Sequence, residues 1–143
     1  MSNVMSVKLA QQMNNDLIAA CRSRLPQEAC GVIYGKKSES GETLIPDGFS
    51  LVRNVSSSAN DSFAFDRNDW IAACYEAQKN QRHIVGVFHS HPAGTCAPSV
   101  RDEQALVPWE SYWIVGFAGP HPNTAVFKHT GDEWIPLPLT CVP

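Results

Sequence analysis

Two histidines and a carboxylate lie at a spacing that suits a metal ion. Residues 89–102 read HSHPAGTCAPSVRD, so His89 and His91 are two positions apart in a run of β-branched and aromatic residues. Alternate side chains of a β-strand point to one face, so both imidazoles can reach a single ion while Ser90 faces the opposite way. Two imidazoles and one carboxylate, here Asp102, are the ligand types of an open zinc site with water in the fourth position.

Each of these residues also has an ordinary structural explanation. A His-x-His pair on a strand is commonly a pair of hydrogen-bonded histidines. Ser99 and Asp102 match an N-terminal helix cap, which stabilises a helix by about 1 kcal/mol without any metal. The two roles can coexist in the same side chains. Cys96 could add a thiolate as a fourth, redox-sensitive ligand, but we expect it to lie in the loop without coordinating the ion.

The pattern around these residues predicts the elements that position them. Helices are expected over residues 10–24, ended by Pro26, and from the cap Asp66 to about Asn80. Strands are expected at 28–35, 42–55 with an interruption at 46–48, 63–65, 83–91, 111–118, 124–130 and 133–139, with a short helix at 99–106. The second helix is expected to bury Trp70, Ile71, Cys74 and Tyr75. This order predicts an α/β sandwich in which helices flank a mixed β-sheet.

Composition indicates one globular domain and argues against several partners. The 143 residues suit a single domain spanning 1–143. With 11 Lys and Arg against 14 Asp and Glu, and no basic run longer than Lys36-Lys37, we expect no nucleic-acid partner. The lack of an 18-residue apolar stretch and of a signal-like N-terminus predicts no membrane association and a cytoplasmic location. The five scattered cysteines argue against a disulfide framework, and most are expected to be reduced and buried.

These motifs resemble those of the JAMM (MPN-plus) zinc metallopeptidase family in its compact prokaryotic form. The shared features are His-Ser-His-Pro, the seven residues 92–98, Ser-x-x-Asp, and Pro-x-Glu-x-Cys-Gly at 26–31, within a resemblance that covers about residues 8–140. It implies a cytidine-deaminase-like fold and hydrolysis of a peptide or isopeptide bond. Carried over by position, the zinc ligands are His89, His91 and Asp102, the general base is Glu28, and the hydroxyl that steadies the oxyanion is Ser99.

The role of Glu28 depends on the resemblance. Spacing alone does not select Glu28 over the other acidic residues Glu39, Glu42, Asp66 and Glu103, and a solvated acid at a helix–strand junction is its ordinary explanation. A carboxylate beside a dry metal site is nevertheless suited to take a proton from water and return it to a leaving amine. We therefore expect Glu28→Gln to separate zinc binding from turnover.

The resemblance also implies a substrate, the tail of a ubiquitin-like or sulfur-carrier protein. We expect a Gly-Gly tail, because the bulky Phe88 and Trp113 beside the metal would favour glycine before the cut. Two alternatives within the family are a peptidase of phage tail assembly and a non-catalytic scaffold, although retention of all five polar positions argues against the scaffold. A nucleoside deaminase is disfavoured, since its Pro-Cys-x-x-Cys pair is absent.

Overall fold

The chain folds around one mixed β-sheet. The computed structural model describes residues 3–104 and 108–143, and within them the sheet has eight strands in the order β7-β6-β5-β4-β2-β3-β1-β8. The strands are β1 (Ser6–Ala10), β2 (Cys30–Lys37), β3 (Thr43–Val52), β4 (His83–His91), β5 (Tyr112–Gly116), β6 (Asn123–His129), β7 (Trp134–Leu137) and β8 (Leu139–Val142). The helices are α1 (Gln11–Arg22), α2 (Arg67–Lys79) and α3 (Val100–Gln104). Parallel pairing joins β4 to β5 and β1 to both β3 and β8, so the predicted mixed α/β architecture is confirmed.

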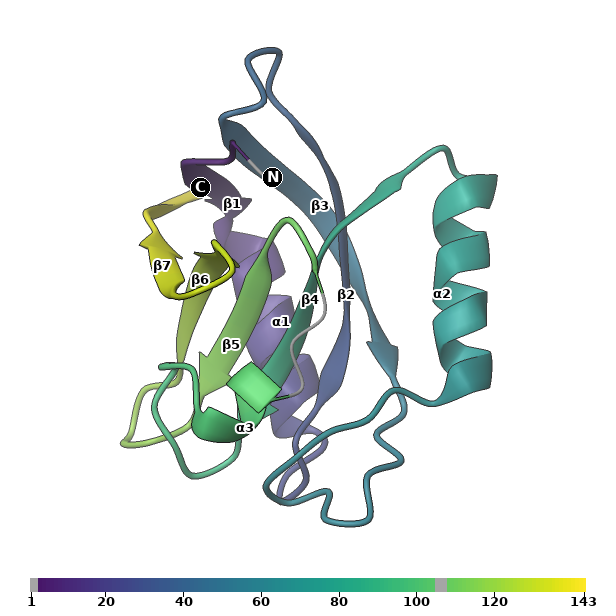
Figure 1. The fold of residues 1–143 in the computed structure, drawn as a ribbon, viewed down its shortest axis with the longest axis vertical. Helices are drawn as coiled ribbons and strands as arrows, with labels where there is room; N and C mark the ends of the chain where they lie inside the picture. Colours follow the sequence, from purple (N-terminus) through teal and green to yellow (C-terminus); the bar gives the residue numbers. More distant parts are fainter. Residues whose placement is uncertain (1–2, 105–107) are drawn as a thin grey trace.

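The two long helices pack on opposite faces of the sheet. α1 buries Met13, Leu17 and Cys21, which recur every four residues as the predicted helical face requires. They join a core that includes Phe88 and Trp113, both fully buried. α2 covers the other face around Val32 and Tyr34. In Figure 1, α1 lies behind the sheet and α2 stands at its right. Side chains that alternate along β4 therefore point either into the α1 core or toward the α2 side.

The buried face of α2 differs from the prediction. The helix follows its predicted cap, Asp66, whose carboxylate accepts a backbone N–H of the first turn at 3.0 Å. Of the four residues expected inside, Trp70 and Cys74 are half-buried, whereas Ile71 and Tyr75 are 54% and 69% exposed. The fully buried positions are Ala73 and Ala77. The small side chain of Ala73 lets the helix approach the sheet closely enough for the Tyr34 hydroxyl to donate to the Ala73 carbonyl.

Three strand predictions need correction. β3 runs unbroken through residues 46–48, because a register shift against β2 leaves Asp47 as an extra residue and accommodates Pro46. Residues 63–65 do not form a strand, although Phe65 makes an isolated bridge with Asn54. The predicted strand at 133–139 is divided at Pro138 into β7 and β8.

The division at Pro138 curves the sheet. β7 pairs with β6 at one edge and β8 pairs with β1 at the other, so a single residue separates the two edges. The Pro138 carbonyl accepts the backbone N–H of Val7 at 2.9 Å, which ties the division to β1. β1 is not among the predicted strands, because the predicted helical pattern begins at residue 10 and no element is predicted before it. The curvature wraps the strands around α1.

Two further observations concern the helices and the cysteines. Among the described residues, no helix combines the length and apolar character that a membrane crossing requires. All five cysteines are free thiols, but only Cys21 and Cys30 are buried, so the expectation that most are buried is wrong. Cys141 is exposed because it lies on β8 at the edge of the sheet.

Candidate metal centre

The structure brings His89, His91 and Asp102 together at the end of β4. His89 Nε2 lies 2.9 Å from Asp102 Oδ1, and His91 Nε2 lies 3.2 Å from Asp102 Oδ2. The two Nε2 atoms are 3.1 Å apart, and the candidate ligand atoms all lie within 4.8 Å of one another. In the described part of the chain this cluster does not include Cys96. Three side chains from β4 and α3 thus converge on one point.

Electrostatics in the cluster favour a neutral His89 and an ionised Asp102, which are the forms of these two groups that bind a metal cation. Burial lowers the pKa of His89, which keeps its imidazole neutral. Burial opposes the charge on Asp102, but hydrogen bonds from His89 and His91 hold the pKa of that carboxyl well below its usual range. Burial also opposes charge on His91, yet its bonds to Asp102 and to the Thr95 carbonyl raise its pKa. A neutral imidazole beside a carboxylate is a ready ligand set for a divalent ion.

Contacts outside the cluster orient the imidazoles. His91 Nδ1 lies 2.7 Å from the Thr95 carbonyl oxygen and donates its proton there, so Nε2 is the ring nitrogen that faces the cluster. The ring of Phe63 stacks on His89 with the centroids 4.7 Å apart and the planes at 22°. This outer support is typical of metal-binding histidines. The residues present therefore fit a metal held by two imidazoles and one carboxylate.

The predicted cap at α3 is present and shares Asp102 with the cluster. Ser99 Oγ accepts the Asp102 N–H at 3.1 Å, and the Ser99 N–H donates to Asp102 Oδ2 at 2.7 Å. This is the reciprocal arrangement of a capping box. The cap and the cluster use the same carboxylate, so forming the helix also orients a candidate ligand. The Ser99 hydroxyl lies in the groove beside His91.

A contact that the sequence did not reveal anchors α3 to the sheet. His129 on β6, which we expected to have a structural or exposed role, places Nε2 3.0 and 3.1 Å from the two carboxylate oxygens of Glu103. Its Nδ1 accepts the Gly131 N–H at 3.1 Å, which leaves the proton on Nε2 to donate to Glu103. Glu103 is 26 residues away, so no local spacing could have paired the two.

Glu28 is buried beside the cluster, immediately before β2. Its side chain is 5% exposed, and among the described residues Oε1 has no hydrogen-bond partner. Burial raises its pKa from 4.5 to about 7. Glu28 lines the same open groove as His91, Ser99 and Arg101, with a volume of about 470 Å³. An unpartnered carboxyl that titrates near neutral pH in a groove is suited to proton transfer.

The buried Ser90 and the half-buried Asn54 position the backbone around Glu28, a role that the sequence did not reveal. The Ser90 hydroxyl points away from the imidazoles, as expected, and accepts the Ala29 N–H at 2.8 Å. The Ser90 N–H donates to the Ala29 carbonyl at 3.0 Å, which ties the histidine strand to the residue after Glu28. Asn54 Nδ2 donates to the Glu28 carbonyl at 3.0 Å. No motif marks Asn54, because its partner is 26 residues away.

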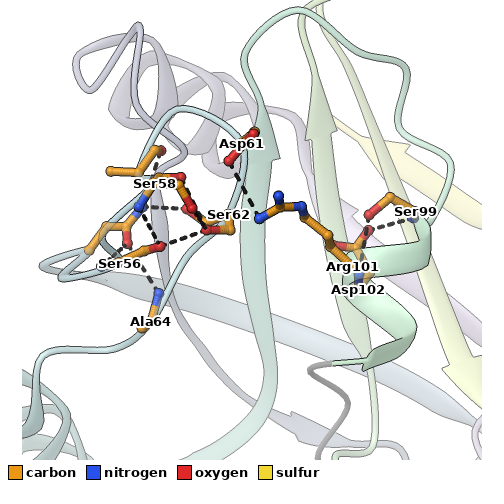
Figure 2. Close-up of polar contacts among 10 residues, drawn as sticks. Ser56, Ser58, Asp61, Ser62, Ala64, Ser99, Arg101 and Asp102 are labelled. Atoms are coloured by element: carbon orange, nitrogen blue, oxygen red, sulfur yellow. Dashed lines mark hydrogen bonds and ion pairs between the residues drawn. The ribbon is translucent and has the colours of Figure 1, made fainter.

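A polar loop forms the other wall of the groove. Residues 53–66 are held by contacts such as the 2.6 Å hydrogen bond between the Ser56 and Ser62 hydroxyls. Figure 2 shows Arg101 extending from α3 toward Asp61 on this loop, and their charged groups are 3.6 Å apart. Both side chains are largely exposed, so this ion pair contributes little stability. The groove thus lies between α3 and the loop.

The aromatic residues beside the cluster are not those expected. Phe88 and Trp113 are fully buried in the α1 core, on the face of the sheet opposite His89. The expectation that these two rings lie beside the metal and favour glycine before the cut is therefore wrong. The aromatic side chains on the cluster's own face are Phe63, Phe65, Trp109, Tyr112 and Trp134, which line a pocket of about 230 Å³ together with His89 and Asp102.

The raised pKa of Glu28 predicts a pH-dependent cost to folding. Between about pH 4.5 and 7 the folded chain keeps a proton that the unfolded chain releases, so stability falls as pH rises through this window. Glu28→Gln has no such group. We therefore expect its free energy of unfolding to rise, relative to that of the parent, by on the order of 2 kcal/mol between pH 4 and pH 8. Urea denaturation of both proteins in chelator at several pH values measures the difference. A difference that is constant with pH would contradict the assignment.

Comparisons with known proteins show the family to which the chain belongs. Residues 10–128 match the family described as prokaryotic homologs of the JAB domain, and the chain belongs to this family. The JAMM resemblance is thereby confirmed. The chain is 28% identical over 88 residues to the desampylase of Pyrococcus furiosus, covering 62% of this chain and 58% of that protein. It is 28% identical over 105 residues to the tail tip assembly protein K of Escherichia phage N15, covering 71% of this chain and 38% of that protein. The chain thus spans less than two thirds of either relative.

Solved structures show the same fold over nearly the whole chain. Protein DSY2949 from Desulfitobacterium hafniense superimposes with a TM-score of 0.84 at 27% identity, covering 95% of this chain and 92% of that one. A protein from Salinibacter ruber gives a TM-score of 0.69 at 21% identity, covering 94% and 90%. The second likeness concerns the fold alone. The described fold is therefore one that these two solved structures share.

Proposed function

We propose that this protein is a zinc-dependent metallopeptidase or isopeptidase that hydrolyses a peptide or isopeptide bond. The observation that carries the proposal is the convergence of two imidazoles and a carboxylate beside the buried Glu28, whose Oε1 has no hydrogen-bond partner among the described residues. Membership of the JAB family and the similarity to a desampylase support a hydrolase. We further propose that residues 1–143 form one catalytic domain with a cytidine-deaminase-like sandwich.

The residues have distinct proposed roles. His89, His91 and Asp102 hold the ion, and Thr95 fixes the orientation of His91. When bound, Zn²⁺ supplies Lewis acidity, which polarises a carbonyl and makes water acidic enough to react near neutral pH. Glu28 accepts the proton of the attacking water and returns it to the leaving nitrogen, for which a pKa of about 7 is well matched. The Ser99 hydroxyl donates to the carbonyl oxygen as negative charge develops there.

We propose the Gly-Gly tail of a ubiquitin-like or sulfur-carrier protein as the substrate. The similarity to a desampylase supports a substrate of the ubiquitin-like class. The open groove that contains Glu28 and Ser99 has room for the leaving group of an extended tail. A Gly-Gly terminus would reach the cluster without any side chain to collide with Phe63 or His91.

A second candidate function is peptide cleavage during phage tail assembly. The similarity to tail tip assembly protein K supports a role in tail assembly, and peptide cleavage there would use the same residues and chemistry. A non-catalytic scaffold is disfavoured, because it has no need for the buried Glu28 carboxyl next to the cluster, whose Oε1 has no hydrogen-bond partner among the described residues.

Cleavage of a carrier fusion tests the proposed function. A small ubiquitin-like carrier ending in Gly-Gly is joined to a reporter peptide and incubated with zinc-loaded protein, and the products are identified by mass spectrometry. We expect a single cut after the second glycine that chelator abolishes and added zinc restores. Cleavage that is insensitive to chelator would contradict the metallopeptidase proposal. Equal cleavage after both glycines are changed to leucine would contradict the tail specificity.

A further inference from the structure

An apolar pocket, less open than the groove, adjoins the metal cluster on a different side from Glu28. Its volume is about 230 Å³, and His89 and Asp102 contribute to its wall. Glu28, His91 and Ser99 line the separate open groove. Among the residues that the structure describes, none lines both spaces. The cluster therefore separates a polar groove from an apolar pocket.

The chemistry of the pocket favours an apolar occupant of limited size. Its wall includes the apolar side chains of Phe63, Phe65, Ile114 and Trp134. The Tyr112 hydroxyl accepts the backbone N–H of Trp109 at 2.8 Å. Pockets for whole small molecules usually exceed about 300 Å³, so this one is sized for a single large side chain. Burial against aromatic rings rewards an aliphatic or aromatic group and penalises a charged one.

The proposed function indicates which part of the substrate lies toward the pocket. Glu28 must return a proton to the leaving nitrogen, so the leaving group occupies the groove that Glu28 lines. The acyl segment then extends away from Glu28, past His89 and Asp102, toward the pocket. The direction assigned to the acyl segment depends on the proposed role of Glu28.

The depth of the pocket indicates which residue of the acyl segment reaches it. β4 and β5 run parallel, with His89 beside Ile114 and Val87 beside Tyr112. The pair Val87 and Tyr112 lies two residues along the strands from the pair that contains the candidate ligand His89, a distance of about 7 Å. An extended substrate advances by the same length in two residues, so the third residue before the cut reaches this level. The two glycines have no side chain to place there.

We propose that this pocket binds an apolar side chain at the residue that precedes the two glycines of the tail. The substrate class is then a ubiquitin-like carrier that ends in apolar-Gly-Gly, and the pocket residues determine specificity. The preference for an apolar residue comes from burying that side chain beside the cluster, without a hydrogen bond or an ion pair to it. This inference deepens the proposed function and rests on it.

A substitution at the rim of the pocket can fill it without touching the cluster. Ala64 lines the pocket and is exposed, and its backbone N–H donates to Asn54 while its carbonyl accepts from Val55. Ala64→Phe leaves these backbone bonds in place and adds a ring at the pocket. Ala72→Phe is the matched control, since Ala72 is an exposed residue of α2 outside the pocket.

The test measures binding without turnover. Fluorescently labelled peptides ending in Leu-Gly-Gly or Asp-Gly-Gly are titrated with the zinc-loaded Glu28→Gln protein, and affinity is read from anisotropy. We expect the leucine peptide to bind at least about 10-fold more tightly, as burial of one aliphatic side chain allows. Ala64→Phe should remove this preference and Ala72→Phe should retain it. Equal affinities, or a preference that survives Ala64→Phe, would overturn the proposal.

Cleavage assays separate this inference from the proposed function. Carrier fusions with leucine or aspartate before the glycines are compared with the parent enzyme. If both fusions are cut at the same rate, the proposed function stands and the pocket proposal is overturned. If neither is cut, yet the leucine peptide binds preferentially and Ala64→Phe removes the preference, the pocket proposal is supported and the proposed hydrolysis fails.

Discussion

Glu28→Gln is expected to keep its full zinc content and to lose at least 100-fold in turnover. The amide has nearly the shape of the carboxyl but cannot accept a proton, and loss of a general base costs about 10²–10⁴-fold. Oε1 of Glu28 has no hydrogen-bond partner among the described residues, so the replacement breaks no side-chain hydrogen bond of that oxygen. The rate on a carrier fusion and the zinc content by elemental analysis are measured on the same preparation.

The control for this variant is Glu39→Gln, which makes the same chemical change at an exposed acid far from the groove. It should leave both the rate and the zinc content unchanged. If Glu28→Gln instead released the zinc, Glu28 would belong to the ligand set, and the proposed division between metal binding and proton transfer would be wrong.

His91→Ala is expected to abolish stable zinc binding and, with it, all detectable hydrolysis. Loss of an outer contact to a metal ligand already costs 10–100-fold in affinity, so removal of a ligand should cost more than about 100-fold. The fold should survive, because His91 lies at the end of β4 and outside the buried core. Zinc titration monitored by elemental analysis, with circular dichroism for the fold, gives the result.

His121→Ala serves as the matched control, since His121 is exposed and lies outside the cluster. It should bind one zinc per chain, like the parent. Full zinc uptake by a folded His91→Ala protein would contradict the proposed ligand set. The same measurement on His89→Ala and Asp102→Ala then shows whether all three side chains are needed.

Relations within one element were readable from the sequence. The alternation of a strand places His89 and His91 on one face with Ser90 on the other, and the structure shows this arrangement. The spacing of a helix start pairs Ser99 with Asp102, and their reciprocal hydrogen bonds are present. Such relations are local, because the geometry of a strand or a helix determines them without reference to the rest of the chain.

The alternation of side chains along β4 also determines the face on which Phe88 lies, contrary to the expectation that its ring stands beside the metal. Phe88 is adjacent to His89 on β4, so it must point to the opposite face, where it is fully buried in the α1 core. The rings beside the cluster instead come from residues 63–65, from the segment around Trp109, and from β5 and β7. Their convergence depends on the order of strands in the sheet.

Relations between elements were decided by the tertiary structure. The sequence alone does not distinguish Glu28 from other acidic residues. In the structure, Ser90 of β4 binds the backbone of the next residue, Ala29, across 61 residues, and Asn54 of the loop binds the Glu28 carbonyl across 26 residues. The contact between His129 and Glu103 exists because the fold places β6 next to α3. Periodicity determines the direction of a side chain from its own element. Which element packs against it depends on how the whole sheet is ordered and curved, and that follows from the burial of apolar surface by all elements together.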